Sequence, residues 1–297
     1  ATEHVKPVYR AMWLFAHSVL VVAQIMTKEF VKLRAMGFEP TNILDIGANK
    51  GDWTREMMRM FPNASFLMID AEDYHRTRDW MPLMASARIN GATAVLDEVE
   101  RDVSWYRIKR EDEAKEPVDT GNSMYEEETG FFDGSVAETR RTQTLDGVVS
   151  NHRPDVVWDL VKLDCQGAEI GALRGGQQAL SGTTVVTLEM PFFGRYNRGA
   201  PTFGKYAAQL DSMGFQPFEI TEVHKLPMET RSGPVEIPFQ IDFIFVRNTS
   251  RIYRQFQNRI ASMASRDKAK KEKEGRHRQS PQATAPRSAW HSPMARG

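Results

Sequence analysis

Apolar runs alternate with helix-type segments over residues 42–247. The runs that read as strands occupy residues 42–47, 65–70, 92–98, 103–110, 156–164, 183–190 and 240–247, and residues 141–149 are also strand-like. Apolar residues at helical spacing occupy residues 52–61, 74–86 and 202–215. This alternation predicts an α/β fold with a mostly parallel sheet and helices on both faces. Ligands of such sheets bind beyond the carboxyl ends of the strands.

A helical segment precedes this region. Residues 8–36 are predicted to form one helix, because Pro7 and Gly37 provide start and stop signals. Its apolar run, residues 11–26, is shorter than the roughly 20 residues of a membrane span. We favour a helix that packs on the domain or on a second copy of the chain, with a signal-peptide core as the alternative. No membrane span is expected, and this helix is a possible homo-oligomer contact.

The charge of the chain is divided between body and tail. The whole chain is neutral, but residues 251–297 hold 12 Lys and Arg against 3 Asp and Glu, a net charge of +9. Residues 1–250 therefore carry −9. A helix is expected to about Ser265, and the polar, Pro- and Ser-rich remainder is expected to be disordered. The predicted organisation is an N-terminal helix (1–39), one domain (40–249) and a basic tail (250–297).

A glycine turn follows the first predicted strand, in ILDIGANKGDWT, residues 43–54. It is not the dinucleotide fingerprint G-x-G-x-x-G, because Asn49 and Asp52 replace the second and third glycines. Asp45 and Asp52 would repel a diphosphate. S-adenosylmethionine fits better, since it carries cationic sulfonium and amino groups and no phosphate. Asp70 ends the second strand, 23 residues after Gly47, where a carboxylate can accept both ribose hydroxyls. The alternative is that Asp45 and Asp70 only cap turns.

Six segments in order carry a family resemblance. They read ILDIGANKGDWT, FLMIDAE, VLDEVERDVSWY, GNSMYEEETGFF, TQTLDGVV and DLVKLDCQGAEIGALRGG. The set resembles the FkbM family of S-adenosylmethionine-dependent methyltransferases over roughly residues 40–247, most specifically in K-x-D-x-x-G-A-E followed by L-R-G. The resemblance implies a Rossmann-like class I methyltransferase fold, whose mostly parallel seven-stranded sheet has an antiparallel last strand. It also implies methylation of hydroxyl oxygens on sugars, polyketides and related molecules.

The same resemblance implies residues that bind the cofactor. The methionine part would contact Asp45, Gly47, Asn49 and Gly51, the ribose Asp70, and the adenine side Asp97 or Glu98 at the end of the third strand. The pair Cys165-Gln166 departs from the family, where an apolar residue followed by an acid is common. This departure removes a carboxylate and weakens a metal-dependent interpretation. The histidines are scattered, so no metal is predicted, and Mg²⁺ on Asp164 and Glu189 has no support.

Methyl transfer to a hydroxyl needs alignment and a base that removes the proton. Asp164, at the end of the fourth strand, is the first candidate base, and Glu189, at the end of the fifth, is the second. Lys162 projects to the same side as Asp164, and is expected either to hold Asp164 charged or to orient the acceptor. The alternatives are structural capping by Asp164, and His152 or His224 as the base. Glu169 is expected either to act in the site or to cap backbone N–H groups.

Residues 111–138 hold 10 acidic groups against one lysine, which argues against an anionic acceptor. The resemblance places Asn122, Ser123 and Tyr125 against cofactor or acceptor, and an aromatic platform for the acceptor is predicted from Phe192, Phe193, Tyr196 and Asn197. We expect an enzyme that methylates a hydroxyl of a small molecule or glycan. The single cysteine fits a reducing compartment, hence a cytoplasmic location. The alternatives are an RNA methyltransferase that uses the basic tail, less favoured because the body lacks interleaved aromatic and basic residues, and a non-catalytic cofactor-binding module.

Overall fold

The computed structural model describes residues 28–107, 121–127, 136–194 and 197–278, the last seven of these by backbone only. Two compact units make up the chain, residues 1–253 and 254–297. The N-terminal helix predicted for residues 8–36 falls mostly outside the described residues, of which 28–35 are helical. No helix among the described residues is long and apolar enough to cross a bilayer.

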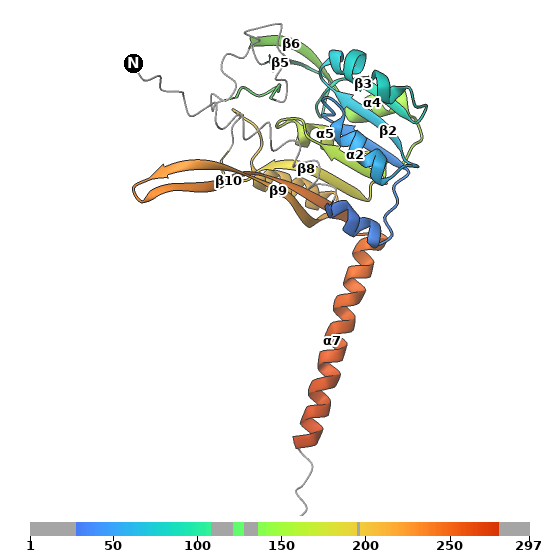
Figure 1. Cartoon of the computed structure of the whole chain (residues 1–297), viewed down its shortest axis with the longest axis vertical. Coiled ribbons are helices and arrows are strands. Elements are labelled where there is room, and N and C mark those ends of the chain that lie inside the picture. Colours follow the sequence, from blue (N-terminus) through green and yellow to red (C-terminus); the bar gives the residue numbers. More distant parts are fainter. Residues whose placement is uncertain (1–27, 108–120, 128–135, 195–196, 279–297) are drawn as a thin grey trace, which may run out of the picture. The chain divides into compact units, whose positions relative to one another are not determined.

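A seven-stranded sheet forms the centre of the first unit (Figure 1). Its strand order is β3-β2-β1-β7-β8-β10-β9. The strands are β1 (Asn42–Ile46), β2 (Ser65–Asp70), β3 (Ile89–Thr93), β7 (Leu160–Leu163), β8 (Val185–Pro191), β9 (Phe215–Thr230) and β10 (Gly233–Arg247). Neighbouring strands are parallel except at β10, which is antiparallel to both β8 and β9. The fold is thus the predicted class I methyltransferase fold with its antiparallel last strand.

Helices cover both faces of this sheet. Because strand residues alternate between the faces, Leu44 packs on one side and Ile43 on the other, each in its own buried cluster. The Leu44 face is covered by α4 (Leu145–His152), α5 (Glu169–Gly175) and α6 (Phe203–Ser212). The Ile43 face is covered by helical residues 28–35, α2 (Asp52–Met60), the π-helix η1 (His75–Asp79) and α3 (Met81–Met84). Asp45 lies on the Ile43 face, together with its strand partners Met68 and Lys162.

Two predicted strands differ from the structure. The strand predicted at 92–98 is wrong as one element, because β3 ends at Thr93 and β4 (Val95–Leu96) joins a separate sheet with β5 (Asp102–Arg107) and β6 (Val136–Gln143). The strand predicted at 141–149 is wrong after Gln143. There Thr144 caps α4 by accepting a hydrogen bond from the Gly147 N–H at 3.1 Å, the usual way in which a threonine starts a helix.

The predicted helix stops are confirmed at two glycines. Gly37 has a φ of 84°, and the N–H of Phe38 returns to the Leu33 carbonyl at 3.0 Å, as in a Schellman motif. Gly214 has a φ of 79° and follows α6 in the same way, with Phe215 buried behind it. Each stop places an aromatic side chain in the core.

The hairpin of β9 and β10 is longer than the sequence predicted. Its strands have 16 and 15 residues, whereas the predicted last strand covered residues 240–247. Figure 1 shows the hairpin running well past the ends of the other strands. Pro217 and Pro227 lie on β9, at the edge of the sheet, where a missing N–H is tolerated.

The C-terminal helix α7 (Arg251–Arg278) is also longer than predicted. The expectation that helix would end near Ser265 is wrong. Residues 266–274 are mostly Lys, Glu, Ala and Arg, which have high helix propensity, and this propensity extends the helix although residues 266–271 are exposed. Residues 279–297 of the predicted disordered tail lie outside the described residues.

The turn after β1 requires a glycine at position 47, because the backbone of Asp164 lies directly against it. Gly47 has a φ of 72°, and a Cβ there would lie 1.8 Å from the Asp164 carbonyl oxygen. We predict that Gly47→Ala lowers the free energy of unfolding by more than about 3 kcal/mol in urea denaturation. The control is Gly204→Ala in α6, where nothing lies within 4 Å of the added carbon. In the control, the free energy of unfolding should rise by about 0.5–1 kcal/mol. Equal changes in the free energy of unfolding for the two substitutions would contradict this account.

Candidate active site

The glycine turn after β1 is held over the end of β2 by backbone hydrogen bonds. The N–H groups of Gly47 and Ala48 donate to the Ile69 carbonyl at 2.8 and 3.1 Å. Asn49 has a left-handed φ of 45°, and its N–H donates to Asp70 Oδ2 at 2.8 Å. The ends of β1 and β2 therefore form one rigid rim.

Asp70 ends β2, as predicted, and lies in this rim, while its predicted contact with the ribose stays a prediction. Its Oδ1 accepts the Glu72 N–H at 2.9 Å and its Oδ2 accepts the Asn49 N–H, so each oxygen still has a lone pair. Burial raises the pKa of the Asp70 carboxyl although these two N–H groups oppose the shift. The side chain is only half-buried, so its remaining lone pairs can receive hydroxyl donors.

Asp45 lies beneath the turn. Its side chain is fully buried, and its Oδ2 accepts the Thr54 hydroxyl at 2.6 Å. Its Oδ1 is 3.5 Å from the ammonium of Lys162. Burial raises the pKa of Asp45, and the charge of Lys162 opposes the shift. The contacts that the structure gives for Asp45 are with protein groups, so its predicted contact with the methionine part stays a prediction.

Lys162 connects the turn to the next strand. Its Nζ donates to the Gly47 carbonyl at 3.1 Å and lies 3.2 Å from Asp164 Oδ2. Burial lowers the pKa of this ammonium, but the charges of Asp164 and Asp45 outweigh burial and raise the pKa above its ordinary value. Lys162 therefore stays charged although its side chain is buried. A charged Lys162 agrees with the predicted role of holding Asp164 ionised.

Asp164 directly follows β7, and Glu189 lies on the neighbouring strand β8. Gln166 Nε2 lies 3.4 Å from Asp164 Oδ1 and 3.2 Å from Glu189 Oε2, so it joins the two carboxyls. Burial raises the pKa of Asp164, but Lys162 and a hydrogen bond with Glu189 outweigh it and lower the pKa overall. Burial and the charge of Asp164 raise the pKa of Glu189 well above its usual range. The Asp164 side chain keeps 39% of its surface exposed and can reach a ligand.

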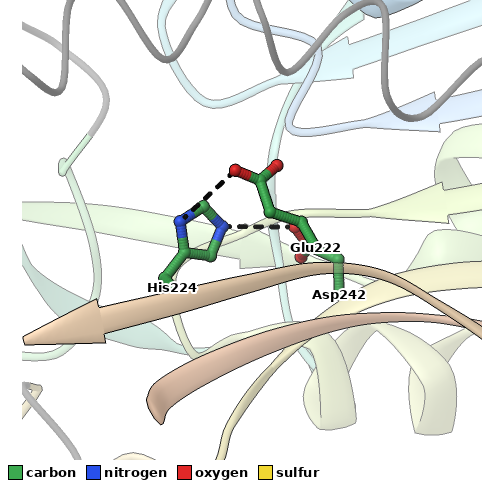
Figure 2. Close-up of side chains that lie close together, drawn as sticks. All are labelled: Glu222, His224 and Asp242. Atoms are coloured by element: carbon green, nitrogen blue, oxygen red, sulfur yellow. Dashed lines mark hydrogen bonds and ion pairs between the residues drawn. The ribbon is translucent and has the colours of Figure 1, made fainter. Parts of the chain in front are cut away.

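A row of carboxylates continues across the sheet. Glu189 pairs with Asp242 on β10, and Asp242 pairs with Glu222 on β9. His224, two residues after Glu222, directs its Nε2 to Asp242 Oδ2 at 3.3 Å and its Nδ1 to Glu222 Oε1 at 3.7 Å (Figure 2). Sequence reasoning missed Glu222 and Asp242. The E-x-H and Q-x-D spacings were visible, but their register depends on the length of the hairpin.

The two histidines that were considered as alternative bases lie in different parts of the fold. His224 belongs to the carboxylate row, whereas His152 lies on α4, with its Nδ1 2.9 Å from the Val148 carbonyl. Burial lowers the pKa of His224, but the hydrogen bond and charge of Asp242 outweigh it and raise the pKa overall. Of the two histidines, the structure places only His224 beside the candidate base residues.

Glu169 closes the turn that follows Asp164. Its carboxylate accepts the N–H groups of Cys165 at 2.7 Å and Gly167 at 3.0 Å, and the Tyr206 hydroxyl at 2.5 Å. Burial raises the pKa of Glu169 although these donors oppose the shift. Glu169 therefore caps backbone N–H groups of the turn before α5, although α5 itself has no side-chain cap, and a role of Glu169 in the chemistry stays a prediction.

The predicted acceptor residues have unequal access. Ser123 is fully buried and its Oγ donates to the Gln166 carbonyl at 2.7 Å, while Asn122 donates to Glu72 at 3.0 Å. Tyr125 is half-buried, with its ring edge 3.0 Å from the position of a Cβ on Gly167. Phe193 is 67% exposed, and Tyr196 lies outside the described residues. The contacts of Asn122 and Ser123 thus hold the 121–127 segment to the turns.

Asn197 borders a small pocket beside Glu189. The side chain is 3% exposed, and its Nδ2 donates to the Gln166 carbonyl at 2.9 Å. Its Oδ1 is buried without a hydrogen-bond donor among the described residues. The pocket wall also includes Gly167, Glu169, Pro191, Ala200 and Tyr206. Among the described residues this oxygen therefore has no donor, and the side chain is almost closed off from solvent.

Asp97 does not end the third strand of the central sheet, so that part of its prediction is wrong. It follows β4, and its carboxylate pairs with Arg101 at 2.7 Å and accepts the Glu98 N–H at 2.8 Å. It packs against Gly171 of α5. The carboxyl end of β3 instead borders an open groove lined by Ala71, Asp73, Thr93, Ala94, Val95, Arg140, Arg141 and Gln143.

The buried ion pair beneath the turn can be tested by a double-mutant cycle. We predict that Lys162→Met lowers the free energy of unfolding by about 3–5 kcal/mol, because Asp45 is left charged and buried. In the double variant Asp45→Asn, Lys162→Met, the free energy of unfolding should fall by clearly less than the sum of the falls in the two single variants, as measured by urea denaturation at neutral pH. Additive losses would mean that the two groups do not interact.

Comparison with known proteins supports one family. The model of the methyltransferase FkbM domain matches residues 45–217. No curated protein matches the chain. Among solved structures, magnesium protoporphyrin IX methyltransferase (ChlM) from Synechocystis PCC 6803, with bound SAM, is 11% identical, with 83% of this chain and 86% of that chain covered and a TM-score of 0.40. A S-adenosylmethionine-dependent methyltransferase from Clostridium acetobutylicum ATCC 824 is 7% identical, with 76% and 90% covered and a TM-score of 0.41.

These structural likenesses are too distant to carry an argument, so the assignment rests on the domain model, which covers more than half of the chain. The rim at Asp70 fits the cofactor that the family uses, since the carboxylate keeps free lone pairs for a ribose diol. The chain belongs to the FkbM domain family of methyltransferases, with S-adenosylmethionine as its cofactor.

Proposed function

We propose that the chain transfers the methyl group of S-adenosylmethionine to a hydroxyl oxygen of a small molecule or glycan. The observation that carries the proposal is the partly exposed carboxylate of Asp164, held by the buried ammonium of Lys162 at the end of β7. It stands between the rim of Asp70 on one side and the pocket beside Glu189 on the other. Cofactor and acceptor would therefore meet at Asp164.

The cofactor lies, on this proposal, along the ends of β2 and β1. Asp70 accepts the ribose hydroxyls, and the rim formed by Gly47 and Asn49 supports the methionine part. The adenine side faces the groove at Thr93 and Arg140 rather than Asp97. When bound, the cofactor supplies an electrophilic methyl group on a positively charged sulfur, which a row of carboxylates favours electrostatically.

Asp164 acts as the general base. As the acceptor oxygen forms its bond to the methyl carbon and the carbon–sulfur bond breaks, the hydroxyl proton passes to the Asp164 carboxylate. Lys162 keeps that carboxylate ionised and fixed, and Gln166 holds its other oxygen toward Glu189. Most of the remaining acceleration comes from alignment of the hydroxyl with the methyl group.

The acceptor binds in the pocket beside Glu189. The carboxyl and amide groups in the wall of this pocket offer oxygens to a second hydroxyl or amine of the acceptor, which suits a polyhydroxylated molecule. Carboxylates in and next to this region disfavour a phosphorylated acceptor. The RNA alternative rests on the basic tail alone, and a phosphate backbone would meet these carboxylates.

Cofactor binding tests the rim. We predict that Asp70→Ala weakens binding of S-adenosylmethionine at least tenfold in titration calorimetry, because two hydrogen bonds to a charged group are lost, each worth about 1.5–3 kcal/mol. The matched control is Asp102→Ala, an exposed acid on β5, which should leave the dissociation constant within about twofold. Equal binding by Asp70→Ala and wild type would refute the assignment of Asp70.

Catalysis tests the base. A screen of sugars and hydroxylated metabolites with methyl-labelled cofactor first identifies an acceptor. We then predict that Asp164→Asn lowers kcat about 10²–10⁴-fold while cofactor binding is retained. Turnover at the wild-type rate in the Asp164→Asn, Glu189→Gln double variant would remove the catalytic assignment, and absence of cofactor binding by the wild-type chain would remove the proposed function.

A further inference from the structure

The hairpin carries three metal-binding side chains at one point. One ligand atom each from Glu222, His224 and Asp242 lies within 4.8 Å of the other two. Figure 2 shows one ring nitrogen of His224 directed at the Glu222 carboxylate and the other at the Asp242 carboxylate. We propose that these three residues bind one divalent transition-metal ion, with Zn²⁺ and Mn²⁺ as the expected ions.

Strand register fixes the three side chains on one face. Glu222 and His224 are two residues apart on β9 and therefore project to the same side of the sheet. Asp242 is the direct partner of Glu222 on β10. The pairing is regular from Gln240–His224 to Asp242–Glu222, and the register shifts just beyond each end of this stretch, so the three residues occupy one short regular part of the hairpin.

Two of the donors already have the separation that an ion requires. Zn²⁺ binds His nitrogen and carboxylate oxygen at about 2.1 Å, so two donors in a tetrahedral site lie about 3.4 Å apart. His224 Nε2 and Asp242 Oδ2 are 3.3 Å apart, a separation that suits their hydrogen bond and also a shared ion. The Glu222 carboxylate now faces the other ring nitrogen at 3.7 Å, and a torsional change of this side chain completes the set.

A separate observation supports a cation at this point. Glu222 Oε2 is buried and has no hydrogen-bond donor among the described residues. A buried carboxylate oxygen without a donor is costly. The side chains of Glu222, His224 and Asp242 are only 14, 23 and 16% exposed, so water screens the group poorly. An ion bound by this oxygen would compensate for the missing donor.

The donor types narrow the choice of ion. One imidazole and two carboxylates suit Zn²⁺, Mn²⁺ or Fe²⁺, whereas Mg²⁺ and Ca²⁺ prefer oxygen alone and Cu⁺ prefers sulfur. Three protein ligands leave a fourth position open for water or an acceptor oxygen. Glu189, the neighbour of Asp242 on β8, lies between this site and Asp164. The metal site is therefore next to the acceptor side of the candidate active site, although its existence does not depend on methyl transfer.

Equilibrium metal binding by the full chain tests the proposal. The chain is freed of metal with a chelator, and Zn²⁺ is titrated into wild type, Glu222→Gln, His224→Gln and Asp242→Asn by calorimetry. We expect one Zn²⁺ site in the wild type whose affinity falls at least tenfold in each variant. The control Glu236→Gln removes an exposed acid from the same hairpin and should bind as the wild type does. Mn²⁺ titration followed by electron paramagnetic resonance provides a second measurement.

The comparison among variants decides the outcome, because histidines outside the cluster also attract Zn²⁺. Thermal unfolding of the metal-free chains shows whether each variant is folded, and cofactor titration shows whether the rest of the site is intact. Loss of the Zn²⁺ site in folded variants that still bind S-adenosylmethionine supports the proposal. Isotherms that coincide for the wild type and all three variants, or a wild type without a site, would overturn it while leaving the proposed function unaffected.

Discussion

The buried ammonium of Lys162 is the interaction on which the site depends. It binds oxygen atoms of Asp45, Gly47 and Asp164, which come from the first strand, the glycine turn and the end of the next strand. Each of these oxygens would otherwise be poorly solvated, and an unpaired buried charge costs several kcal/mol. One cation thus serves two purposes, because it supports the turn of the cofactor rim from below and keeps the proposed base ionised above.

Sheet geometry explains why so many acids gather at one place. Parallel strands present their carboxyl ends at the same edge, and side chains two residues apart share a face. Asp164 and Glu189 follow from this rule on β7 and β8. The antiparallel hairpin extends the row to Asp242 and Glu222, which lie in mid-strand because β9 and β10 continue past the edge. The hairpin therefore forms a polar wall next to Glu189, on the acceptor side of the site.

The sequence predicted the elements whose signals are local. The first strand, its glycine turn and Asp70 were found within a residue, because apolar runs and glycines mark them directly. The assignment of Asp97 to the third strand was wrong, because the chain changes sheets at Ala94, which no local pattern reveals. The proximity of Glu222 and Asp242 could not be predicted from the sequence, because it depends on how β9 and β10 are paired. The sequence marks Gly47 as part of a turn, but it does not show that the atom which excludes a side chain there is the Asp164 carbonyl oxygen.

The carboxylates of the site differ in how many partners they already have, and this difference separates structural from chemical roles. Glu169 accepts three donors and is buried, so little of it remains for a ligand. Asp164 has Lys162 and Gln166 as partners but keeps an exposed surface. Glu189 lies between Asp164 and Asp242 and is joined to the base through Gln166. Burial and the charge of Asp164 raise the pKa of Glu189, whereas Lys162 lowers that of Asp164. Of these two neighbouring carboxyls, Asp164 is therefore the one that is held ionised, and this difference favours Asp164 over Glu189 as the base.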